Sequence, residues 1–338
     1  MSALQITWFW LIFLLLTVYA VLDGFDLGSG FWYLFAKWDR DKRTILNSIG
    51  PFWDGNEVWL LTGAGSIFAA FPHVYATVFS GFYLPFMLII FSFILRAVSI
   101  EFRNKIESSA WQNFWGLCFS VGSIVPTFLF GVAAGNIMRG LPLNEYMGYT
   151  GNFIFLLNPF ALLIGFLSLA AFATHAATYL VIRIKGEIIS MARSWVVKSW
   201  RFYIVLFIIT FMVIYYTQPR LFQNYFDSPI LWIVPAATFS SIMKIWAFQR
   251  KGWEIKSFIA SVFSIIGLMI MFALAIFPNT VPAINDAGLS LTIANSSSSE
   301  LTLKTMLIIA LIGMPFVVGY TAWIYYKFSG RVGAEDEY

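Results

Sequence analysis

Runs of about 20 apolar residues recur from one end of the chain to the other, and they constrain the fold more than any other feature. A helix of about that length crosses the ~30 Å hydrocarbon core of a bilayer. Of the 338 residues, 59% are hydrophobic and 11% are charged, whereas a soluble domain has about 25% charged residues. Because helices satisfy their backbone hydrogen bonds within one segment, the sequence predicts an all-α polytopic membrane protein.

We predict nine transmembrane helices, of which the second is short and begins with charged residues. They cover roughly residues 5–36, 54–71, 76–101, 111–137, 157–182, 201–217, 228–247, 256–277 and 304–327. Of the 21 lysines and arginines, 18 lie in the segments that follow the odd-numbered helices. Positive residues mark the cytoplasmic side, so we expect the N-terminus outside and the C-terminus in the cytoplasm. Since these residues form short clusters between apolar runs, the pattern argues against nucleic-acid binding.

Prolines suggest an internal organisation. Pro85 and Pro235 lie within the third helix of the first and second groups of four. We therefore expect the single membrane domain, 1–338, to contain two four-helix bundles and one peripheral helix. Their approximate bounds are 1–140, 150–280 and 304–327. The N-terminus has neither a basic segment nor a small-residue cleavage site, so we expect the first run to be retained as a helix.

Acidic residues inside the first helix are candidates for function, because ionisable groups within a bilayer are costly. Asp23 and Asp26 are three residues apart and share one helix face. Asp26 is expected about 15 Å from the cytoplasmic end of its helix, at 1.5 Å per residue.

More charged residues cluster at the predicted cytoplasmic end of the next two helices. Asp54 and Glu57 open the second helix, and Arg96 and Glu101 end the third. The five acids of these helices form a possible ladder from the cytoplasmic surface inward, and we expect Trp53 and Arg96 to support it. Carboxyl groups in such surroundings can exchange protons near neutral pH, so the pattern predicts a proton pathway.

Structural roles explain some of these residues equally well. Asp54 and Glu57 fit a helix cap with its capping partner. Arg96 could pair with Glu101 or with an acid of another helix. The two acids of the first helix could hydrogen-bond across helices and hold them together.

Histidine and cysteine are scarce, which limits cofactor chemistry. Cys118 is the single cysteine, so no intrachain disulfide is possible. His73 and His175 are expected at opposite membrane levels, where they cannot form a bis-histidine haem site together. We expect hydrogen-bonded structural roles for them, with no catalytic residue, cofactor or metal site in this chain.

Two segments carry a resemblance to a known family. Residues 22–28 (LDGFDLG) and 53–60 (WDGNEVWL) closely resemble the opening region of subunit II of cytochrome bd quinol oxidases. The resemblance extends over the whole chain. Further matching segments are 68–72, 79–83, 96–107, 174–180, 289–293 and 320–323.

The resemblance implies a partner, subunit I, which carries two b haems, haem d and the quinol-oxidising loop. Such a complex lies in the bacterial cytoplasmic membrane, oxidises quinol on the outer side and reduces O₂ to water with cytoplasmic protons. It builds a proton gradient without pumping. Subunit II has a similar fold, ligates no haem in most members and forms a heterodimer with subunit I. A small single-helix accessory subunit and membrane lipid are further partners to consider.

The family pattern also assigns residues. Its conducting acid corresponds to Asp54, and its first-helix acid to Asp26. Some relatives have Gln at the position of Glu57, and some have Asp at the position of Glu101. Two alternatives stay open beside the hypothesis that the chain is an oxidase subunit. The chain could be a stand-alone ion-coupled transporter, or a structural scaffold whose acids are inert.

Overall fold

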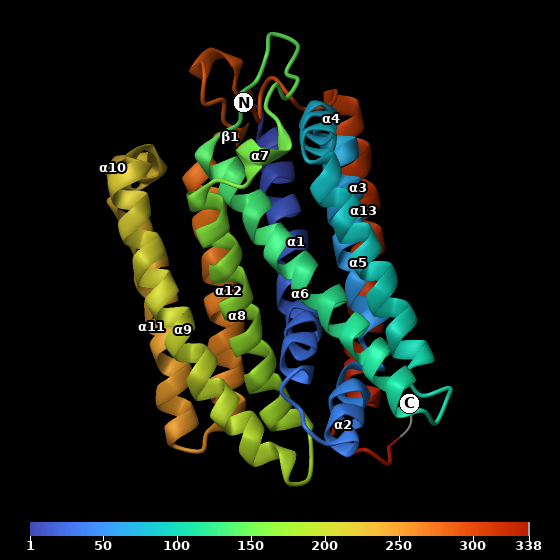
Figure 1. Cartoon of the computed structure of the whole chain (residues 1–338). Helices are drawn as coiled ribbons and strands as arrows, with labels where there is room; N and C mark the ends of the chain where they lie inside the picture. The colour runs from blue at the N-terminus through green and yellow to red at the C-terminus, as the bar shows by residue number, and fades with distance from the viewer. Residues whose placement is uncertain (337–338) are drawn as a thin grey trace.

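A computed structural model describes residues 1–336, and these fold into a bundle of long helices (Figure 1). Within this part of the chain, eight helices are long and apolar enough to cross a membrane. They are α1 (Ala3–Tyr33), α5 (Tyr83–Phe102), α6 (Ser109–Arg139), α8 (Pro159–Arg183), α9 (Ile188–Thr217), α11 (Ile233–Arg250, with the preceding turn), α12 (Glu254–Ile276) and α13 (Glu300–Lys327). The all-α, multi-pass fold is confirmed.

A ninth span is formed only if two bent helices are counted together. Helix α3 (Trp53–Ala70) and helix α4 (Pro72–Gly81) meet at an angle of 119°. The predicted third helix, 76–101, is wrong at its start, because residues 76–81 belong to α4 and the membrane helix α5 begins at Tyr83. Pro72 explains the break between α3 and α4. Its ring and its missing backbone N–H exclude it from a helix interior and favour it in a first turn.

Short elements lie at the two ends of the bundle. Helix α2 (Asp39–Ile49) lies near the C-terminus at the lower end in Figure 1. The N-terminus, α4, α7, α10 and β1 lie at the upper end. The elements not yet given bounds are α7 (Phe153–Leu156), α10 (Gln223–Asp227), the 3₁₀ turns η1 (Pro219–Phe222), η2 (Pro229–Trp232) and η3 (Ala287–Leu289), and the antiparallel strands β1 (Asn279–Val281) and β2 (Leu291–Thr292).

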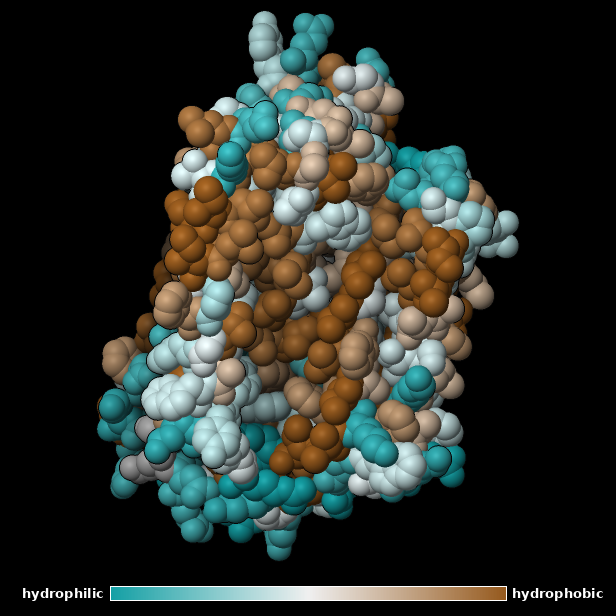
Figure 2. Space-filling model, turned by 180° about the vertical axis from the view of Figure 1, so that it is seen from behind, coloured by the Kyte–Doolittle hydropathy of each residue, from teal (hydrophilic) through white to brown (hydrophobic). Residues whose placement is uncertain are grey.

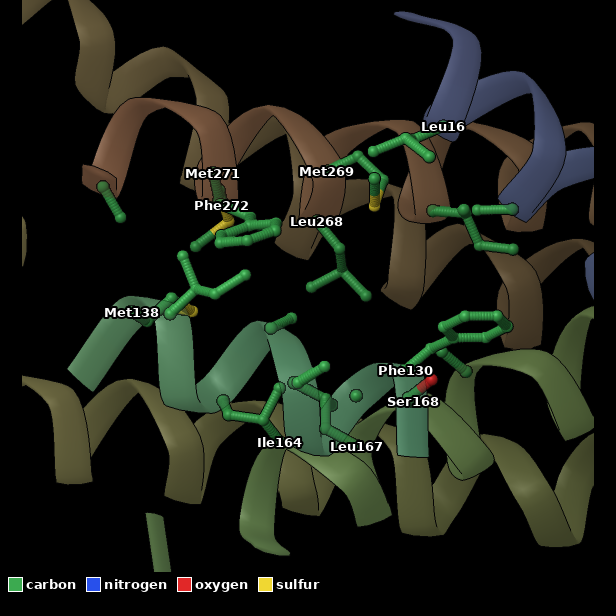
Figure 3. A pocket seen from close by; sticks show the side chains of 18 of the residues that line it. Leu16, Phe130, Met138, Ile164, Leu167, Ser168, Leu268, Met269, Met271 and Phe272 are labelled. Atoms are coloured by element: carbon green, nitrogen blue, oxygen red, sulfur yellow. The ribbon is translucent and has the colours of Figure 1, made fainter. Parts of the chain in front are cut away.

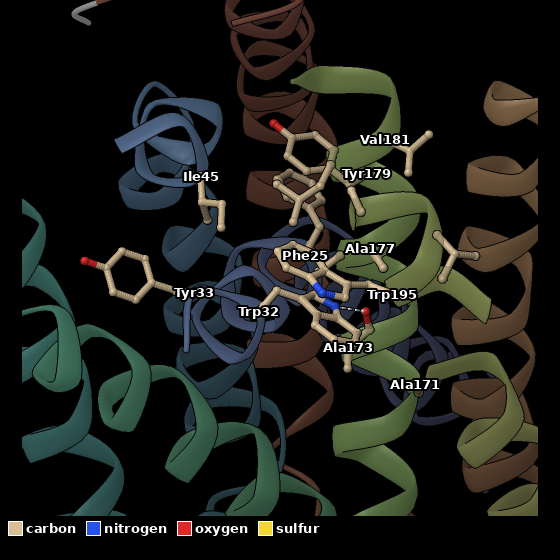
Figure 4. Close-up of a cluster of buried hydrophobic side chains, with 14 of the residues drawn as sticks. Phe25, Trp32, Tyr33, Ile45, Ala171, Ala173, Ala177, Tyr179, Val181 and Trp195 are labelled. Atoms are coloured by element: carbon tan, nitrogen blue, oxygen red, sulfur yellow. Dashed lines mark hydrogen bonds between the residues drawn. The ribbon is translucent and has the colours of Figure 1, made fainter. Parts of the chain in front are cut away.

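Helix α1 runs through the middle of the bundle and packs on α3, α6, α8 and α12. A Cβ atom on Gly28 would lie 2.2 Å from the backbone oxygen of Phe172, so the α1 and α8 backbones are in direct contact. Trp32 stacks on Trp195 with ring centroids 4.8 Å apart, and its indole nitrogen donates to the Ala173 carbonyl at 2.6 Å (Figure 4). These contacts join α1 to α8 and α9 in one core, and the division into two bundles stays a prediction.

Hydrophobic side chains cover the middle of the face shown in Figure 2, and hydrophilic ones gather at its two ends. Helix α13 contributes many exposed apolar side chains and packs against α1 and α3. This surface fits a chain surrounded by hydrocarbon.

Candidate functional site

Arg96 of α5 lies buried among three carboxylates from two other helices. Its Nη2 and Nη1 atoms donate to Asp23 Oδ1 and Oδ2 at 2.6 and 3.1 Å, a bidentate contact. Glu57 Oε1 lies 3.3 Å from Nη1, and Asp26 Oδ2 lies 3.9 Å from Nη2. The side chains of Arg96 and both aspartates are fully buried, whereas that of Glu57 is 23% exposed. We call Asp23, Asp26, Glu57 and Arg96 the acidic cluster.

Two uncharged residues connect this cluster to the last helix. Asn56 Nδ2 donates to Asp26 Oδ2 at 2.7 Å, and Asn56 Oδ1 accepts from the Tyr325 hydroxyl at 3.0 Å. The Tyr325 ring stacks on Phe52, with centroids 4.5 Å apart. The peripheral helix α13 therefore reaches the cluster through one amide side chain.

Helical spacing accounts for this convergence. Asp23 and Asp26 are three residues apart on α1, so both face the same neighbours. Asn56 and Glu57 are adjacent in the first turns of α3, and one contacts Asp26 while the other contacts Arg96.

The cluster does not balance its own charge. One guanidinium faces three carboxyl groups, so the group would carry a net charge of minus two with all acids ionised. Uncompensated charge within a membrane is costly, and two bound protons would bring the cluster to zero. Asp26 Oδ1, Glu57 Oε1 and Arg96 Nε are buried without a hydrogen-bond partner in the described chain. Such atoms call for an explanation in a native structure, and the two carboxyl oxygens, unlike the Arg96 guanidinium, are groups that can take up and release a proton.

Other residues predicted for the ladder lie outside this cluster. Asp54 is exposed in the first turn of α3, and Trp53 beside it is half-buried. Glu101 is exposed near the end of α5, and no ion pair involving it occurs in residues 1–336. Arg96 thus pairs with acids of other helices, which was one of its two predicted alternatives.

The predicted helix cap at Asp54 is wrong. Helix α3 begins at Trp53, its cap residue is Phe52, and no side chain caps it. Asp54 comes too late to cap the helix, and Glu57 contacts Arg96 on another helix. The predicted hydrogen bonds of Asp23 and Asp26 across helices are present.

His175 is buried with both ring nitrogens close to protein atoms. Nδ1 lies 2.8 Å from Ser261 Oγ, and Nε2 lies 2.9 Å from the Val21 carbonyl. Its ring also stacks on Phe258. His73 is exposed on α4, at the opposite end of the bundle from α2. Within residues 1–336, no group of three or more His, Cys, Asp or Glu side chains could hold a metal ion.

A separate apolar cavity of about 350 Å³ lies between helices, and Figure 3 shows part of its lining. Leu16, Phe130, Met138, Leu268 and Phe272 point into it from α1, α6 and α12. Nearly all of the lining is hydrocarbon, so this cavity offers no chain of groups for proton transfer.

Long apolar helices around a buried cluster of charges define the class of the molecule, a multi-pass membrane protein. The family described as cytochrome bd terminal oxidase subunit II matches residues 4–328, and the chain belongs to this family. It is therefore a subunit of a cytochrome bd oxidase, a quinol oxidase complex with a second subunit.

Individual relatives agree with this assignment. The chain is 36% identical to cytochrome bd-I ubiquinol oxidase subunit 2 of Escherichia coli K12, over 99% of this chain and 97% of the relative. It is 32% identical to cytochrome bd ubiquinol oxidase subunit 2 of Bacillus subtilis 168, over 99% of both chains. Its fold matches a chain of the bd oxidase from Geobacillus thermodenitrificans with a TM-score of 0.79 at 16% identity, over 97% of this chain and 99% of the other.

Proposed function

We propose that this chain is the haem-free subunit of its oxidase and carries cytoplasmic protons toward the haem-bearing subunit I. In this proposal, subunit I oxidises quinol and reduces O₂, and its two b haems and haem d supply the redox chemistry. The acidic cluster is the observation that carries the proposal, because its charge balance favours the binding and release of protons.

The order of the acids supports a path. Asp54 is exposed, Glu57 is partly exposed, and Asp23 and Asp26 are fully buried. Asp54 and Glu57 are one helical turn apart, a rise of about 4.5 Å. A proton taken up at Asp54 would pass to Glu57 and then reach the aspartates around Arg96.

The histidines support the haem-free assignment. A histidine ligates haem iron through a free ring nitrogen. Both nitrogens of His175 already contact Ser261 and Val21. His73 is exposed on α4, at the opposite end of the bundle from α2. Neither histidine therefore fits the role of an axial haem ligand that shares the iron with a second ligand from this chain.

We further propose that the N-terminus lies outside and the C-terminus in the cytoplasm of a bacterial plasma membrane. The positive-inside pattern supports this orientation. Basic residues are frequent around α2 and the C-terminus, at one end of the bundle, and the acidic cluster would then open toward the cytoplasm.

A purely structural role for the acids is the second candidate, favoured by the bidentate contact between Arg96 and Asp23. A stand-alone transporter is less consistent with the geometry. Transporters bind ions at broken helices near the midplane, and the described break between α3 and α4 lies at the other end of α3 from Glu57.

The Asp54→Asn variant of the assembled complex separates a proton path from a structural role. We expect oxygen consumption with quinol to fall at least tenfold, which is about 1.4 kcal/mol in the activation barrier. Haem absorbance should stay unchanged, because Asp54 is exposed and outside the salt-bridged core. Glu107→Gln is the matched control, an exposed acid just beyond the end of α5 that lies outside the predicted ladder. Normal turnover of Asp54→Asn would remove Asp54 from the path.

A further inference from the structure

Two of the three basic residues on the predicted outer side converge at the end of helix α6. These three are Arg139, Arg220 and Lys304. Arg139 is the last residue of α6, and Arg220 donates through Nη2 to its carbonyl oxygen and, at 2.9 Å, to that of Met138. This leaves a cationic corner on the side of the molecule that otherwise has few positive charges.

A cleft of about 490 Å³ opens beside this corner, between the end of α6, the start of α8 and the end of α9. It is distinct from the acidic cluster and from the cavity in Figure 3, with which it shares no lining residue. Its lining comprises Arg139, Asn158, Pro159, Phe160, Leu163, Val213, Thr217 and Gln218.

The lining has two layers. Asn158 caps the start of α8 and Gln218 caps the end of α9, so the polar groups form a rim at the helix ends. Leu163 and Val213 each lie five residues further into their helices, about 7.5 Å deeper at 1.5 Å per residue. A polar rim above apolar walls matches the boundary between the headgroups and the acyl chains of a bilayer.

Charge narrows the choice of ligand. The Arg139 guanidinium lies 4.6 Å from the centre of the Phe155 ring, and no carboxylate of residues 1–336 lies within 4.0 Å of it. None of the lining residues is acidic. One helix N-terminus, that of α8, and two helix C-termini, those of α6 and α9, lie on this rim, so the helix dipoles oppose one another and the charge of the cleft comes from Arg139. Because Arg139 is the one charged residue of the lining and no carboxylate neutralises it, the cleft complements an anion and repels a cation.

We infer that this cleft binds an anionic phospholipid of the outer leaflet, with its phosphate at Arg139 and an acyl chain along Leu163 and Val213. The guanidinium fork suits phosphate oxygens. The apolar walls explain why a lipid is favoured over free phosphate. The lipid inference does not depend on the proton path. The lipid-binding test therefore does not decide whether protons pass through the acidic cluster, and the turnover test does not decide whether lipid binds.

The test uses the assembled complex in detergent, stripped of lipid and titrated with phosphatidylglycerol while bound lipid is counted by native mass spectrometry. Phosphatidylcholine with the same acyl chains is the ligand control, and Lys304→Gln, which removes an outer-side cation that does not line the cleft, is the protein control. We expect Arg139→Gln to weaken phosphatidylglycerol binding about tenfold and to leave phosphatidylcholine binding unchanged. Lys304→Gln should change neither.

A second variant keeps the inference testable if Arg139→Gln does not fold. Leu163→Trp fills the apolar wall and keeps Arg139, so it should also weaken phosphatidylglycerol binding, with haem absorbance intact. Millimolar inorganic phosphate should not displace the lipid. Three results would overturn the inference: equal lipid binding by Arg139→Gln and the unchanged complex, displacement by inorganic phosphate, or loss of the second subunit from Arg139→Gln, which would indicate a protein carboxylate as the partner.

Discussion

At the scale of single residues, Arg96 has the most demanding surroundings in the molecule. It is the one cation within 4.0 Å of Asp23, Asp26 and Glu57 among the described residues. Removing one partner of a buried ion pair costs more than the pair contributes, because the remaining charges stay buried without compensation. Stability and proton handling are therefore linked at this residue.

The Arg96→Gln variant tests this link. We expect it to lower the free energy of unfolding by about 3–5 kcal/mol, since it leaves three carboxyl groups without a cation. Thermal unfolding of the purified complex is the measurement. Adding Asp23→Asn to Arg96→Gln should restore part of the loss, and an unchanged melting temperature for the single variant would contradict the description of the cluster.

The Tyr325 hydroxyl allows a second prediction, of a smaller loss of stability that comes from a single hydrogen bond. Tyr325→Phe removes the hydroxyl that donates to Asn56 and keeps the ring on Phe52. We expect a loss of about 0.6 kcal/mol, the usual size of a hydrogen bond between membrane helices. The matched control is Tyr326→Phe, where the side chain is 80% exposed. Equal melting temperatures for the two variants would show that the Asn56 contact does not hold α13.

Residue chemistry explains which parts of the site could be predicted from the sequence. Asp23, Asp26, Glu57 and Arg96 stand out because charges are rare in apolar runs. Asn56 and Tyr325 carry no charge, and Tyr325 lies 269 residues from Asn56 in the chain. No local pattern links them, so their contact appears only when α13 is placed against α3.

At the scale of helices, close backbone approach holds α1 against α8. Gly28→Ala would place a Cβ atom 2.2 Å from the Phe172 carbonyl oxygen and 2.6 Å from Ala176 Cβ. We expect a loss of about 1–3 kcal/mol from overpacking, measured by thermal unfolding. Gly313→Ala in α13 is the control, because nothing lies within 4 Å of the added atom. A stable Gly28→Ala protein would mean that the helices can separate without cost.

An ion pair links helix α2 to the end of α5. Asp39 accepts from Arg103 and, at 2.8 Å, from Arg43. Partial burial disfavours the Asp39 carboxylate, but the two guanidinium groups outweigh it and hold the pKa of Asp39 below its usual range. Because the pKa is lower in the folded state, the pair stabilises the fold above about pH 4, the pKa of an unfolded aspartate. That contribution is lost as the pH falls through the folded pKa.

Melting curves of the unchanged complex and of Asp39→Asn between pH 7 and pH 3 check this. The difference in melting temperature should be constant near neutral pH and should shrink below about pH 4. Since Asp39 is partly exposed, 1 M salt should also reduce it. A difference that grows on acidification would contradict the assignment.

Helix boundaries show where prediction from hydropathy fails. The apolar runs located the long helices because length and composition are visible in the sequence. The break after α3 was predicted, but residues 76–81 were wrongly joined to the next membrane helix instead of to the separate helix α4, since hydropathy averaged over a window does not report where one apolar helix ends and the next begins. Gly81, the last residue of α4, is the local signal that could have located the missed break, because glycine weakens a helix.

At the scale of the whole molecule, α1 joins the two predicted bundles, and its acids lie against α3 and α5 while its other faces pack on α8 and α12. The family match identifies an oxidase subunit, and the fold match agrees with it. The family could be recognised from two short segments because they contain the cluster's acids. A cleft such as the one beside Arg139 depends on three helix ends that only the fold brings together.

Proton uptake by the Glu57→Gln complex during O₂ reduction tests the proton-path proposal most directly. Glu57 is the partly exposed acid that contacts Arg96, and glutamine keeps its size while removing its exchangeable proton. We predict uptake at least tenfold slower than in the unchanged complex and in Glu107→Gln, with unchanged haem absorbance. Uptake at the normal rate in Glu57→Gln would contradict a proton path through the acidic cluster.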